Sequence, residues 1–389
     1  MNKRDFDRFG IQILQDEGFE VTVWDLTPCL HPGFYSTLEI PDRIDYRNLH
    51  IFERKADVLM SIAAFQDTDL AVCLIGFDYN SRFFYRAFSQ HHIRYCVWQA
   101  ISLPVSINPD TAISFSWRKF LKKIAGMRLR AIGNHVVTRL MKKHYRLFGV
   151  RPATIAMLAG ERSDDTYFYP IDKTTKKLWL HLLDYDIYLE QRQQADRMFP
   201  GRYAVFLDEY LPFHPDYKYI GVEPPVSADE YYPGLCSFFA FLEKKYDLRV
   251  IIAAHPRSKY DAPQEYFGDR TVFRGKTAGL VRDAEFVIAH MSTAIDFAVL
   301  FNKPLIFVTN DILSRQQDGL LPFGRYIDTV AAAFHKKPVN IDAVNYVDWD
   351  EEMNVDPGVY QKYRNAFIKK DGTPELPFWK IVADYIHTL

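Results

Sequence analysis

Cysteine is scarce in this chain of 389 residues, and its spacing excludes several kinds of site. The four cysteines, Cys29, Cys73, Cys96 and Cys236, lie far apart and show no Cys-x-x-Cys spacing. Zinc sites and disulfide frameworks need closely and regularly spaced cysteines. We therefore expect free thiols in the core, no metal site and no bound cofactor.

The sequence also lacks long apolar runs. None approaches the length that spans a membrane, and the N-terminus begins with charged residues instead of the apolar core of a secretion signal. We therefore expect a protein of the reducing cytoplasm, with a peripheral position on the inner face of the cell membrane as a further possibility to test.

Three common motifs are missing. There is no Gly-x-x-x-x-Gly-Lys-Ser/Thr loop, no Gly-x-Gly-x-x-Gly fingerprint and no Gly-x-Ser-x-Gly elbow. These absences exclude the usual forms of P-loop nucleotidases, dinucleotide-binding enzymes and serine hydrolases. Internal repeats are absent as well, so a solenoid is not expected.

The length and the net charge of the chain limit its domain organisation and its kinds of partner. A chain of 389 residues is too long for one compact core, and its net charge of -1 argues against nucleic acid as a partner. We predict an N-terminal domain over residues 1–200 and a C-terminal domain over residues 201–389. The boundary is placed at Phe199-Pro200-Gly201, which ends one charged helical stretch before the next apolar strand.

Acidic residues are missing from one long segment. No Asp or Glu occurs from Thr111 to Gly160, whereas 11 Lys and Arg residues alternate there with bulky apolar ones. We interpret residues 111–150 as a basic amphipathic insertion. It fits an anionic membrane surface, an anionic glycan or lipid-linked acceptor, or a helical excursion whose charges face water.

The beginning of the chain is unusual for an α/β domain. A helical pattern follows Met1 directly, and no strand precedes it. Since such domains normally open with a strand that leads into the first helix, we expect the true N-terminus to lie upstream of Met1.

Short apolar runs then alternate with helical patterns, as in parallel α/β folds. In the N-terminal half we predict strands at Glu20–Trp24, Leu49–Phe52, Leu70–Ile75, Arg94–Trp98, Ala153–Leu158 and Lys177–Leu183, and helices at Lys55–Phe65, Arg82–Gln90 and Tyr188–Met198. In the C-terminal half we predict strands at Tyr203–Leu207, Arg249–Ala254, Glu285–Ala289 and Pro304–Val308, and helices at Asp229–Tyr246 and Thr293–Phe301.

Polar residues follow each strand of the C-terminal half. Because the carboxyl ends of parallel strands share one edge of the sheet, where α/β proteins bind ligands, these residues are expected to face one crevice. They are Asp208, Glu209 and His214 after the first strand; His255, Pro256, Arg257 and Ser258 after the second; His290, Ser292 and Thr293 after the third; and Asp311 after the fourth.

Two of these groups are suited to phosphate. Ser292 and Thr293 stand where a strand ends and a helix begins, which offers hydroxyls and free backbone N–H groups. His255 and Arg257, separated by Pro256, add an imidazole and a fixed cation. Ser292 or Thr293 could equally cap the helix, and His255 could be an ordinary residue at a strand end.

The pair Asp208-Glu209 offers carboxylates at the same edge. A carboxylate there can take a proton from a hydroxyl group if its surroundings give it a suitable pKa. The alternative is that Asp208 caps the following turn and Glu209 is solvated.

The order of these motifs resembles a known family. An acidic pair, a His-Pro and a Ser-Ser/Thr, here Asp208-Glu209, His255-Pro256 and Ser292-Thr293, are shared by bacterial sialyltransferases and polysialyltransferases that use CMP-sugars and by related Kdo transferases. The phrase HMSTAIDFAVLFNKPLIF is similar to CDP-glycerol glycerophosphotransferases. The resemblance covers about residues 203–311. It departs at Tyr210, where a glycine is usual.

The resemblance implies the GT-B fold, with two Rossmann-like domains facing a central cleft and C-terminal helices, Pro357–Lys369 and Pro374–Leu389, crossing back to the first domain. It implies a metal-independent glycosyltransferase that moves a sugar, such as sialic acid or Kdo, from a CMP-activated donor onto a capsule or lipopolysaccharide glycan.

In this reading Asp208 is the base and His255 assists the leaving phosphate. Donor-phosphate contacts are expected from Pro256, Arg257, Ser258, Lys276, Thr277, His290, Ser292 and Thr293, and acceptor or supporting contacts from Glu209, His214 and Asp311.

Three alternatives remain open. A CDP-polyol phosphotransferase would use His255 and His290 on the transferred phosphoryl group. A sugar-nucleotide epimerase of the same fold needs no acceptor. In a non-enzymatic scaffold subunit of a polysaccharide assembly, His255 could be replaced without effect.

Overall fold

The structure, a computed structural model, describes residues 1–36, 38, 43–105, 138, 140–165, 168–262, 264–319 and 321–389. They form two compact units. Unit 1 is made by the described residues of Met1–Ile101, Phe115–Leu183 and Lys369–Leu389, and unit 2 by those of Ser102–Ser114 and Asp184–Ile368. The sequence-based boundary at residue 200 thus falls inside unit 2.

Unit 2 is built on an open sheet of six parallel strands. Its strands are β7 (Tyr203–Leu207), β8 (Arg249–Ala254), β9 (Val272–Arg274), β10 (Val287–Ala289), β11 (Leu305–Thr309) and β12 (Val339–Asn340). Their order across the sheet is β12-β11-β10-β7-β8-β9. The chain therefore builds outwards from β7 to β9 on one side and then returns to β10 on the other side of β7, which makes the β7/β10 junction a topological switch point.

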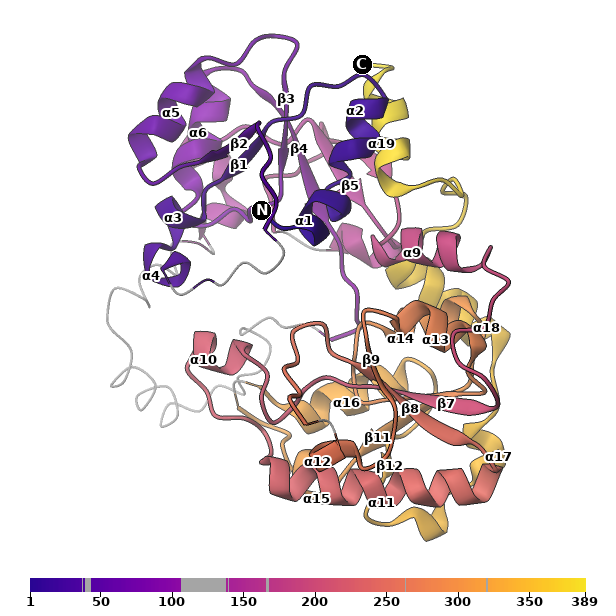
Figure 1. Cartoon of the computed structure of the whole chain (residues 1–389). Helices are drawn as coiled ribbons and strands as arrows, with labels where there is room; N and C mark the ends of the chain where they lie inside the picture. The colour runs from indigo at the N-terminus through magenta and orange to yellow at the C-terminus, as the bar shows by residue number, and fades with distance from the viewer. Residues whose placement is uncertain are drawn as a thin grey trace. The chain divides into compact units, whose positions relative to one another are not determined.

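Helices cover both faces of this sheet, because alternate residues of each buried strand point to opposite sides. Ala204 and Phe206 of β7 belong to the core beneath α11 (Ala228–Tyr246). On the opposite face, the hydroxyl of Tyr203 donates a hydrogen bond to the carbonyl of Leu280 in α13 (Thr277–Asp283). Figure 1 shows α11 along one side of the sheet and α13 and α14 (Ile295–Leu300) on the other.

The remaining helical segments of unit 2 precede the sheet, connect its strands or follow it. They are α9 (Asp184–Gln191), α10 (Asp216–Ile220), α12 (Gln264–Phe267), α15 (Asp311–Ser314), α16 (Phe323–Ala332), η3 (Val344–Tyr346), α17 (Trp349–Glu352), α18 (Pro357–Tyr363) and the π-helical η4 (Arg364–Ile368).

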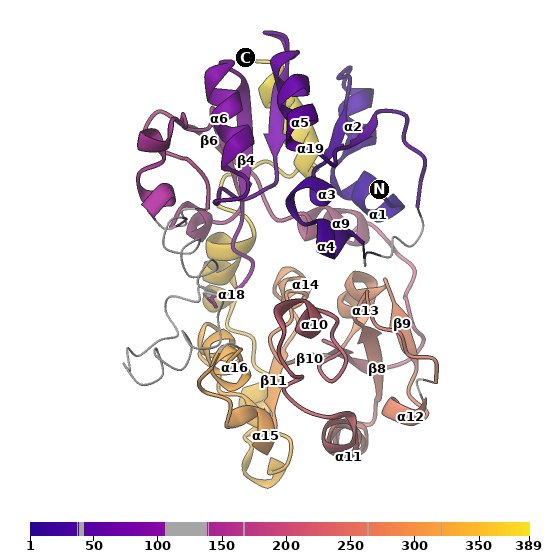
Figure 2. The same cartoon turned by 90° about the vertical axis from the view of Figure 1, so that its left-hand side faces the viewer.

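Unit 1 contains two parallel sheets within its described residues. One pairs β1 (Val23–Asp25) with β2 (Leu49–Ile51), and the other has β3 (Leu70–Cys73), β4 (Arg94–Gln99), β5 (Ile155–Leu158) and β6 (Lys176–Trp179) in that order. Helices α5 (Lys55–Ala63) and α6 (Arg82–Gln90) lie side by side in Figure 2 and pack against each other. The other helical segments are α1 (Lys3–Arg8), α2 (Ile11–Asp16), α3 (Thr27–Leu30), α4 (Pro32–Tyr35), η1 (Tyr145–Phe148) and η2 (Glu161–Asp165).

The C-terminal helix α19 (Phe378–Ile386) returns to unit 1. Phe378 and Trp379 are buried in one cluster with Ile155 and Met157 of β5. The indole N–H of Trp379 donates a hydrogen bond to the carbonyl of Arg8 over 2.8 Å. The family resemblance implied that both C-terminal helices return to the first unit; the last one does, whereas α18 and η4 belong to unit 2.

The α/β class with two parallel-sheet units, as the GT-B-like prediction required, is confirmed. One helix is displaced from its predicted place: α9 begins at Asp184 instead of Tyr188, and the residues up to Met198 form turns that hydrogen-bond to Asp283. Most of the basic insertion, residues 106–137 and 139, lies outside the described residues. Among the described residues, no helix combines the length and apolarity needed to cross a bilayer.

Candidate active site

The switch point of unit 2 carries an acidic side chain bonded to backbone amides. Glu209 follows β7, and its Oε1 atom accepts a hydrogen bond from the backbone N–H of Met291, just after β10, over 2.7 Å. A second backbone hydrogen bond comes from Ser292. The carboxylate thus spans the two strand ends between which α/β proteins bind ligands.

Glu209 is partly buried, and this burial raises its pKa to about 7. The neighbouring Asp208 charge raises the pKa further, while the two backbone hydrogen bonds oppose the shift. A carboxyl group with this pKa exchanges its proton near neutral pH, which is the property that a general acid or base needs.

Asp208, the base expected from the sequence, is placed differently. Its side chain is only 4% exposed. It accepts hydrogen bonds from the backbone N–H groups of Tyr210 (2.9 Å) and His255 (3.3 Å) and from the hydroxyl of Tyr260 (2.9 Å). Burial raises its pKa to about 6. Through these contacts Asp208 links the end of β7 to the end of β8. Its buried carboxylate leaves little room for an acceptor hydroxyl to approach.

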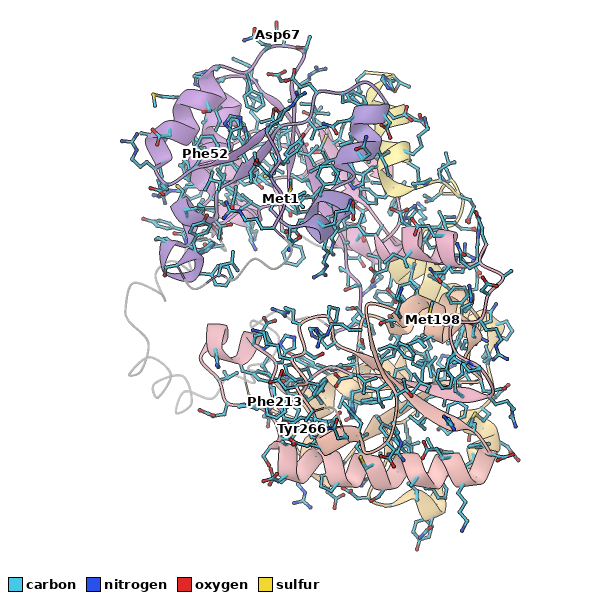
Figure 3. All side chains as sticks on the ribbon, in the orientation of Figure 1. Met1, Phe52, Asp67, Met198, Phe213 and Tyr266 are labelled. Atoms are coloured by element: carbon cyan, nitrogen blue, oxygen red, sulfur yellow. The ribbon has the colours of Figure 1, made fainter. Side chains whose placement is uncertain are left out.

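Aromatic rings account for the burial of Asp208. Tyr260 packs against Tyr210 and Tyr266, with ring centroids 5.0 and 5.4 Å apart. Phe213 contacts Tyr266 edge-on at 5.6 Å, and both are labelled in Figure 3. The sequence analysis missed this aromatic shell, since tyrosines are frequent throughout the chain and their spacing shows no pattern.

Tyr210 adopts a backbone conformation that glycine takes easily. Its φ angle is 55°, in the left-handed region. This conformation costs a residue with a Cβ atom roughly 1–2 kcal/mol. The family that the sequence resembles usually has a glycine at this position, and the left-handed turn accounts for that preference. In this chain the buried ring of Tyr210 supplies the packing that holds the strained turn.

His255 and its neighbours form a polar cluster after β8. The Nδ1 atom of His255 accepts the backbone N–H of Arg257, and the His255 ring packs edge-on against His214 at 4.8 Å between centroids. The Arg257 guanidinium bonds to Asp216 over 2.9 Å and to the His214 ring over 3.1 Å. Burial and the Arg257 charge lower the pKa of His214 despite the opposing Asp216 charge.

In the loop that follows β8, Pro256 is exposed and Ser258 is buried. The hydroxyl of Ser258 donates a hydrogen bond to the carbonyl of His255 over 2.7 Å, and the side chain is buried. Ser258 therefore closes the loop that presents His255, which differs from the phosphate contact expected from the sequence.

His290 does not face a ligand. It is buried, with Nδ1 against the carbonyl of Val308 (2.6 Å) and Nε2 against the hydroxyl of Tyr231 (2.8 Å). Burial lowers its pKa to about 4, so the ring is neutral, donating from Nδ1 and accepting at Nε2. Both ring nitrogens are occupied, which leaves none for a phosphate. The expected donor contact from His290 is thus replaced by a structural bond between β10, β11 and α11.

Ser292 and Thr293 lie in the turn between β10 and α14. Ser292 Oγ accepts the backbone N–H of Ala294 over 3.2 Å, as a local cap does, and Thr293 is exposed. Helix α14 begins two residues later than predicted, at Ile295. The hydroxyls stand beside the amides that hold Glu209.

Other expected contacts lie further along the same sheet edge. Lys276 and Thr277 are at the start of α13, after the edge strand β9, and Lys276 is exposed. Asp311 bonds to the side chain of Asn340 over 2.7 Å, at the β11/β12 side of the sheet. In the strand order, Lys276 and Thr277 follow β9, which neighbours β8, whereas Asp311 follows β11, which is separated from β8 by β7 and β10.

The sequence led us to expect no metal site. Three Asp-x-Asp triplets, a pattern typical of metal-dependent sugar-nucleotide sites in another transferase fold, occur at residues 67–69, 184–186 and 348–350. They lie before β3 in unit 1, and at the start of α9 and the start of α17 in unit 2. The described residues contain no cluster of three His, Cys, Asp or Glu suited to a metal ion.

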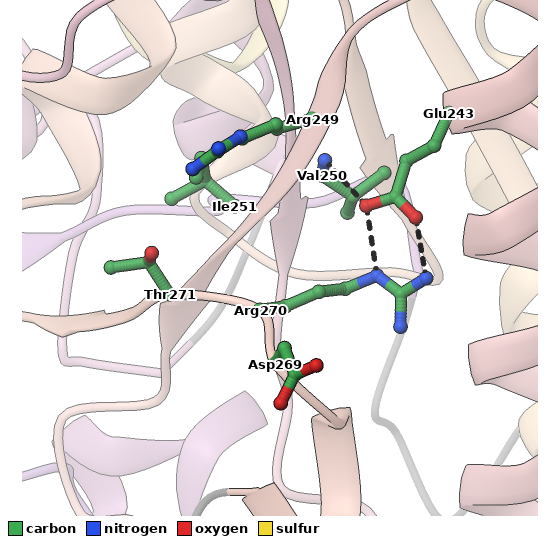
Figure 4. Close-up of a pocket in the computed structure, with 7 residues that line it drawn as sticks. All are labelled: Glu243, Arg249, Val250, Ile251, Asp269, Arg270 and Thr271. Atoms are coloured by element: carbon green, nitrogen blue, oxygen red, sulfur yellow. Dashed lines mark hydrogen bonds and ion pairs between the residues drawn. The ribbon is translucent and has the colours of Figure 1, made fainter.

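A pocket of about 410 Å³ opens at the opposite end of β8. Glu243 and Arg270 form a two-point ion pair there, and Glu243 also accepts the backbone N–H of Val250 (Figure 4). At this end of β8 no residue of β9 is paired with it, because the pairing of the two strands begins only at Ile252. The pocket lies at this unpaired edge, and the charges of Glu243 and Arg270 neutralise each other there.

Comparison with known proteins leaves the family open. No family model matches the chain, and no curated protein matches it. Solved structures with similar architecture include a putative UDP-N-acetylglucosamine 2-epimerase from Listeria monocytogenes (9% identity over 88% of this chain and 84% of that one, TM-score 0.48).

Two others are a variant of the wall teichoic acid polymerase TagF (11% identity, 90% of this chain and 79% of that one, TM-score 0.47) and the glycotransferase of kitacinnamycin (12% identity, 97% and 93%, TM-score 0.43). At these values the similarities carry no argument about function, which rests on the chemistry of the site.

Proposed function

We propose that this protein is a glycosyltransferase that moves a sugar from a cytidine-nucleotide donor, a CMP-activated ulosonic acid, onto a glycan acceptor. One observation carries the proposal: a carboxyl group with a pKa of about 7, Glu209, spans the switch point of a Rossmann-like sheet, and the loop after the neighbouring strand β8 carries an imidazole and a guanidinium. Proton transfer and charge stabilisation are the two tasks of sugar transfer from a nucleotide.

Glu209 is the proposed base. The acceptor hydroxyl attacks the anomeric carbon of the donor, and its proton passes to the Glu209 carboxylate. The bond between the anomeric carbon and the phosphate oxygen breaks, and its electron pair leaves with CMP. Asp208 supports this step as a positioning residue, since it holds the backbone of His255 and raises the pKa of Glu209.

His255 and Arg257 are the proposed partners of the leaving phosphate. The Arg257 guanidinium is already held by Asp216 and His214, so little side-chain freedom is lost on binding. Ser292 and Thr293 add hydroxyls at the end of β10. Lys276 remains a candidate for longer-range attraction of the anionic donor.

A CDP-polyol phosphotransferase is the second candidate. It is favoured by the two adjacent imidazoles of His214 and His255, which could both contact a transferred phosphoryl group. In that reaction His214 takes the place that the sequence analysis assigned to His290.

Products distinguish these reactions. The purified chain is incubated with CMP-sialic acid, CMP-Kdo, CDP-glycerol or UDP-N-acetylglucosamine, with and without a capsular or lipopolysaccharide glycan. We expect CMP and an extended glycan from a CMP-sugar. Transfer of glycerol phosphate would support the second candidate, and an epimer formed without acceptor would overturn both.

His255→Ala tests the site itself. We expect less than a few per cent of the wild-type transfer rate with an unchanged circular dichroism spectrum, because the leaving phosphate loses its imidazole contact. His91→Ala, which changes an exposed histidine of unit 1, is the matched control. Full activity of His255→Ala would refute the assignment and support a structural role for His255.

The proposed acceptor is a growing cell-surface polysaccharide or glycolipid. Such acceptors are carried on lipids, so the proposed place of action is the inner face of the cell membrane.

A further inference from the structure

Unit 1 exposes large apolar side chains along one short segment next to the undescribed part of the insertion. Met141 and Tyr145 point inwards and are buried in the unit 1 core. The residues between and after them point outwards: Leu140 is 52% exposed and Leu147 is 84% exposed. Leu140, Lys143, His144, Leu147 and Phe148 form what we call the 140–148 ridge.

The ridge combines these apolar groups with positive charge. Lys143 is exposed within the ridge, and Lys142 lies over the ring of Phe168, itself 45% exposed, at 5.4 Å. Among the described residues, neither lysine has a recorded ion pair. Arg86 lies beside Gly149, at 3.6 Å from the position of a Cβ atom there, and extends the positive surface.

Negative charge hardly offsets this surface. The sequence holds no Asp or Glu from Thr111 to Gly160. Arg146 is ion-paired with Asp172, whose hydrogen bonds also include the hydroxyl of Tyr145 at 3.0 Å. The only acid that the described contacts place beside the segment is therefore engaged by Arg146.

A single exposed leucine is ordinary on a protein surface. The grouping of three large apolar side chains with two lysines is different, because a water-facing helix turn gains nothing from exposing large apolar side chains. Both are used when a surface enters the interface of an anionic membrane, where apolar side chains are buried among acyl chains and lysines reach the lipid headgroups.

We propose that the 140–148 ridge docks unit 1 on a bilayer that contains anionic lipid. Leu140, Leu147 and Phe148 enter the headgroup region, and Lys142 and Lys143 contact the lipid phosphates. The proposal is independent of the transferase reaction, since a membrane-bound protein of any activity could use this surface.

Co-sedimentation with vesicles tests the docking on the full chain. Wild-type protein is expected to bind phosphatidylglycerol vesicles and to bind phosphatidylcholine vesicles much more weakly. Binding should decrease between low salt and physiological salt, because ions screen the lysine–phosphate attraction. Absence of wild-type binding to phosphatidylglycerol would overturn the proposal.

Two variants separate the contributions. Lys142→Gln/Lys143→Gln is expected to weaken binding about 25-fold, since each lysine near such a surface adds about 1 kcal/mol, or roughly fivefold. Leu140→Ser/Leu147→Ser is expected to weaken binding on the order of tenfold or more through lost burial of apolar area. Leu140 and Leu147 are both exposed in the free protein, so the free energy of unfolding should not change in the leucine variant.

A control variant and a competing probe complete the test. Met60→Ser/Lys244→Gln changes one exposed methionine and one exposed lysine elsewhere and should bind as wild type does. Heparin serves as a soluble polyanion. If heparin binds more tightly than the vesicles, and the leucine variant binds vesicles as wild type does, the surface is a glycan site and the membrane proposal is wrong.

Discussion

Tyr210 shows how one residue constrains the site. Its left-handed backbone turns the chain directly after the acidic pair, so that Asp208 points into the protein and Glu209 towards β10. The sequence reveals the departure from glycine at this position, but only the φ angle shows that the turn itself is retained.

Replacing Tyr210 tests this turn. At most positions glycine is less stable than alanine, but in the left-handed region the order reverses. We expect Tyr210→Gly to be more stable than Tyr210→Ala by about 1 kcal/mol, or about 2–4 °C in Tm, although both lose the ring. At the exposed α11 position Lys244, the same pair should show the opposite order. Equal Tm values for the two Tyr210 variants would argue against strain.

The raised pKa of Glu209 has a consequence for stability. A carboxyl group with a pKa of about 7 in the folded chain, against an ordinary value of 4.5, binds its proton more tightly when folded. Stability from this group is therefore greatest below pH 4.5 and is lost as the pH rises to about 7. Glu209→Gln should remove this loss, so its Tm relative to wild type should increase between pH 5 and pH 8.

The same residue should govern the pH dependence of transfer. The base acts when deprotonated, so wild-type activity should rise with pH through about 7, and Glu209→Gln should lose on the order of 10²–10⁴-fold in rate. A variant that keeps the wild-type rate would exclude Glu209 as the base.

At the scale of elements, buried strands were predicted most accurately. β7 and β8 have the predicted bounds because continuous apolar runs fit a central parallel strand. The edge strand β9 was missed, since Val272–Arg274 offers only three residues of signal. Helix α9 was shifted because the polar residues after Gln191 have helical spacing but form turns.

The sequence predicted that the candidate site lies at the strand ends. It could not predict which way the side chains at these ends point. His255 and His290 both follow apolar strands, yet the first borders an exposed loop and the second is sealed between Val308 and Tyr231. Periodicity does not report such contacts, because the partner of His290 lies 59 residues away in α11.

Tyr231→Phe tests the bond between α11 and β10. The change leaves the buried Nε2 atom of His290 without its donor and should cost about 1–3 kcal/mol of unfolding free energy, measured by urea denaturation. Tyr346→Phe, at a tyrosine that is 94% exposed, is the control and should have no effect. If the two changes cost the same, the hydrogen bond contributes nothing.

At the scale of the whole chain, the last 21 residues complete unit 1. Trp379 packs over Gly10, whose positive φ and missing Cβ atom make room for the indole ring. Sequence periodicity indicated the helix, and the family resemblance supplied its return to the first unit. The membrane interpretation of the insertion falls mostly outside the described residues and stays a prediction there.

Trp379→Ala should destabilise unit 1 by about 3–5 kcal/mol, because it removes a large buried ring and its hydrogen bond to Arg8. Hydrogen exchange should accelerate in β4 and β5, which share its cluster, and remain slow in β7 and β8 of unit 2. Faster exchange in β7 and β8 alone would contradict the assignment of α19 to unit 1.

The central claim is that a nucleotide phosphate binds at the carboxyl edge of the unit 2 sheet. Arg257 and Arg249 test it directly, because these exposed arginines flank opposite ends of the same strand β8. The measurement is calorimetric titration with CMP. The account predicts at least tenfold weaker CMP binding for Arg257→Ala, since a charged hydrogen bond contributes about 1.5–3 kcal/mol, and a change within about twofold for Arg249→Ala. CMP binding that is weakened by Arg249→Ala and unaffected by Arg257→Ala would contradict it.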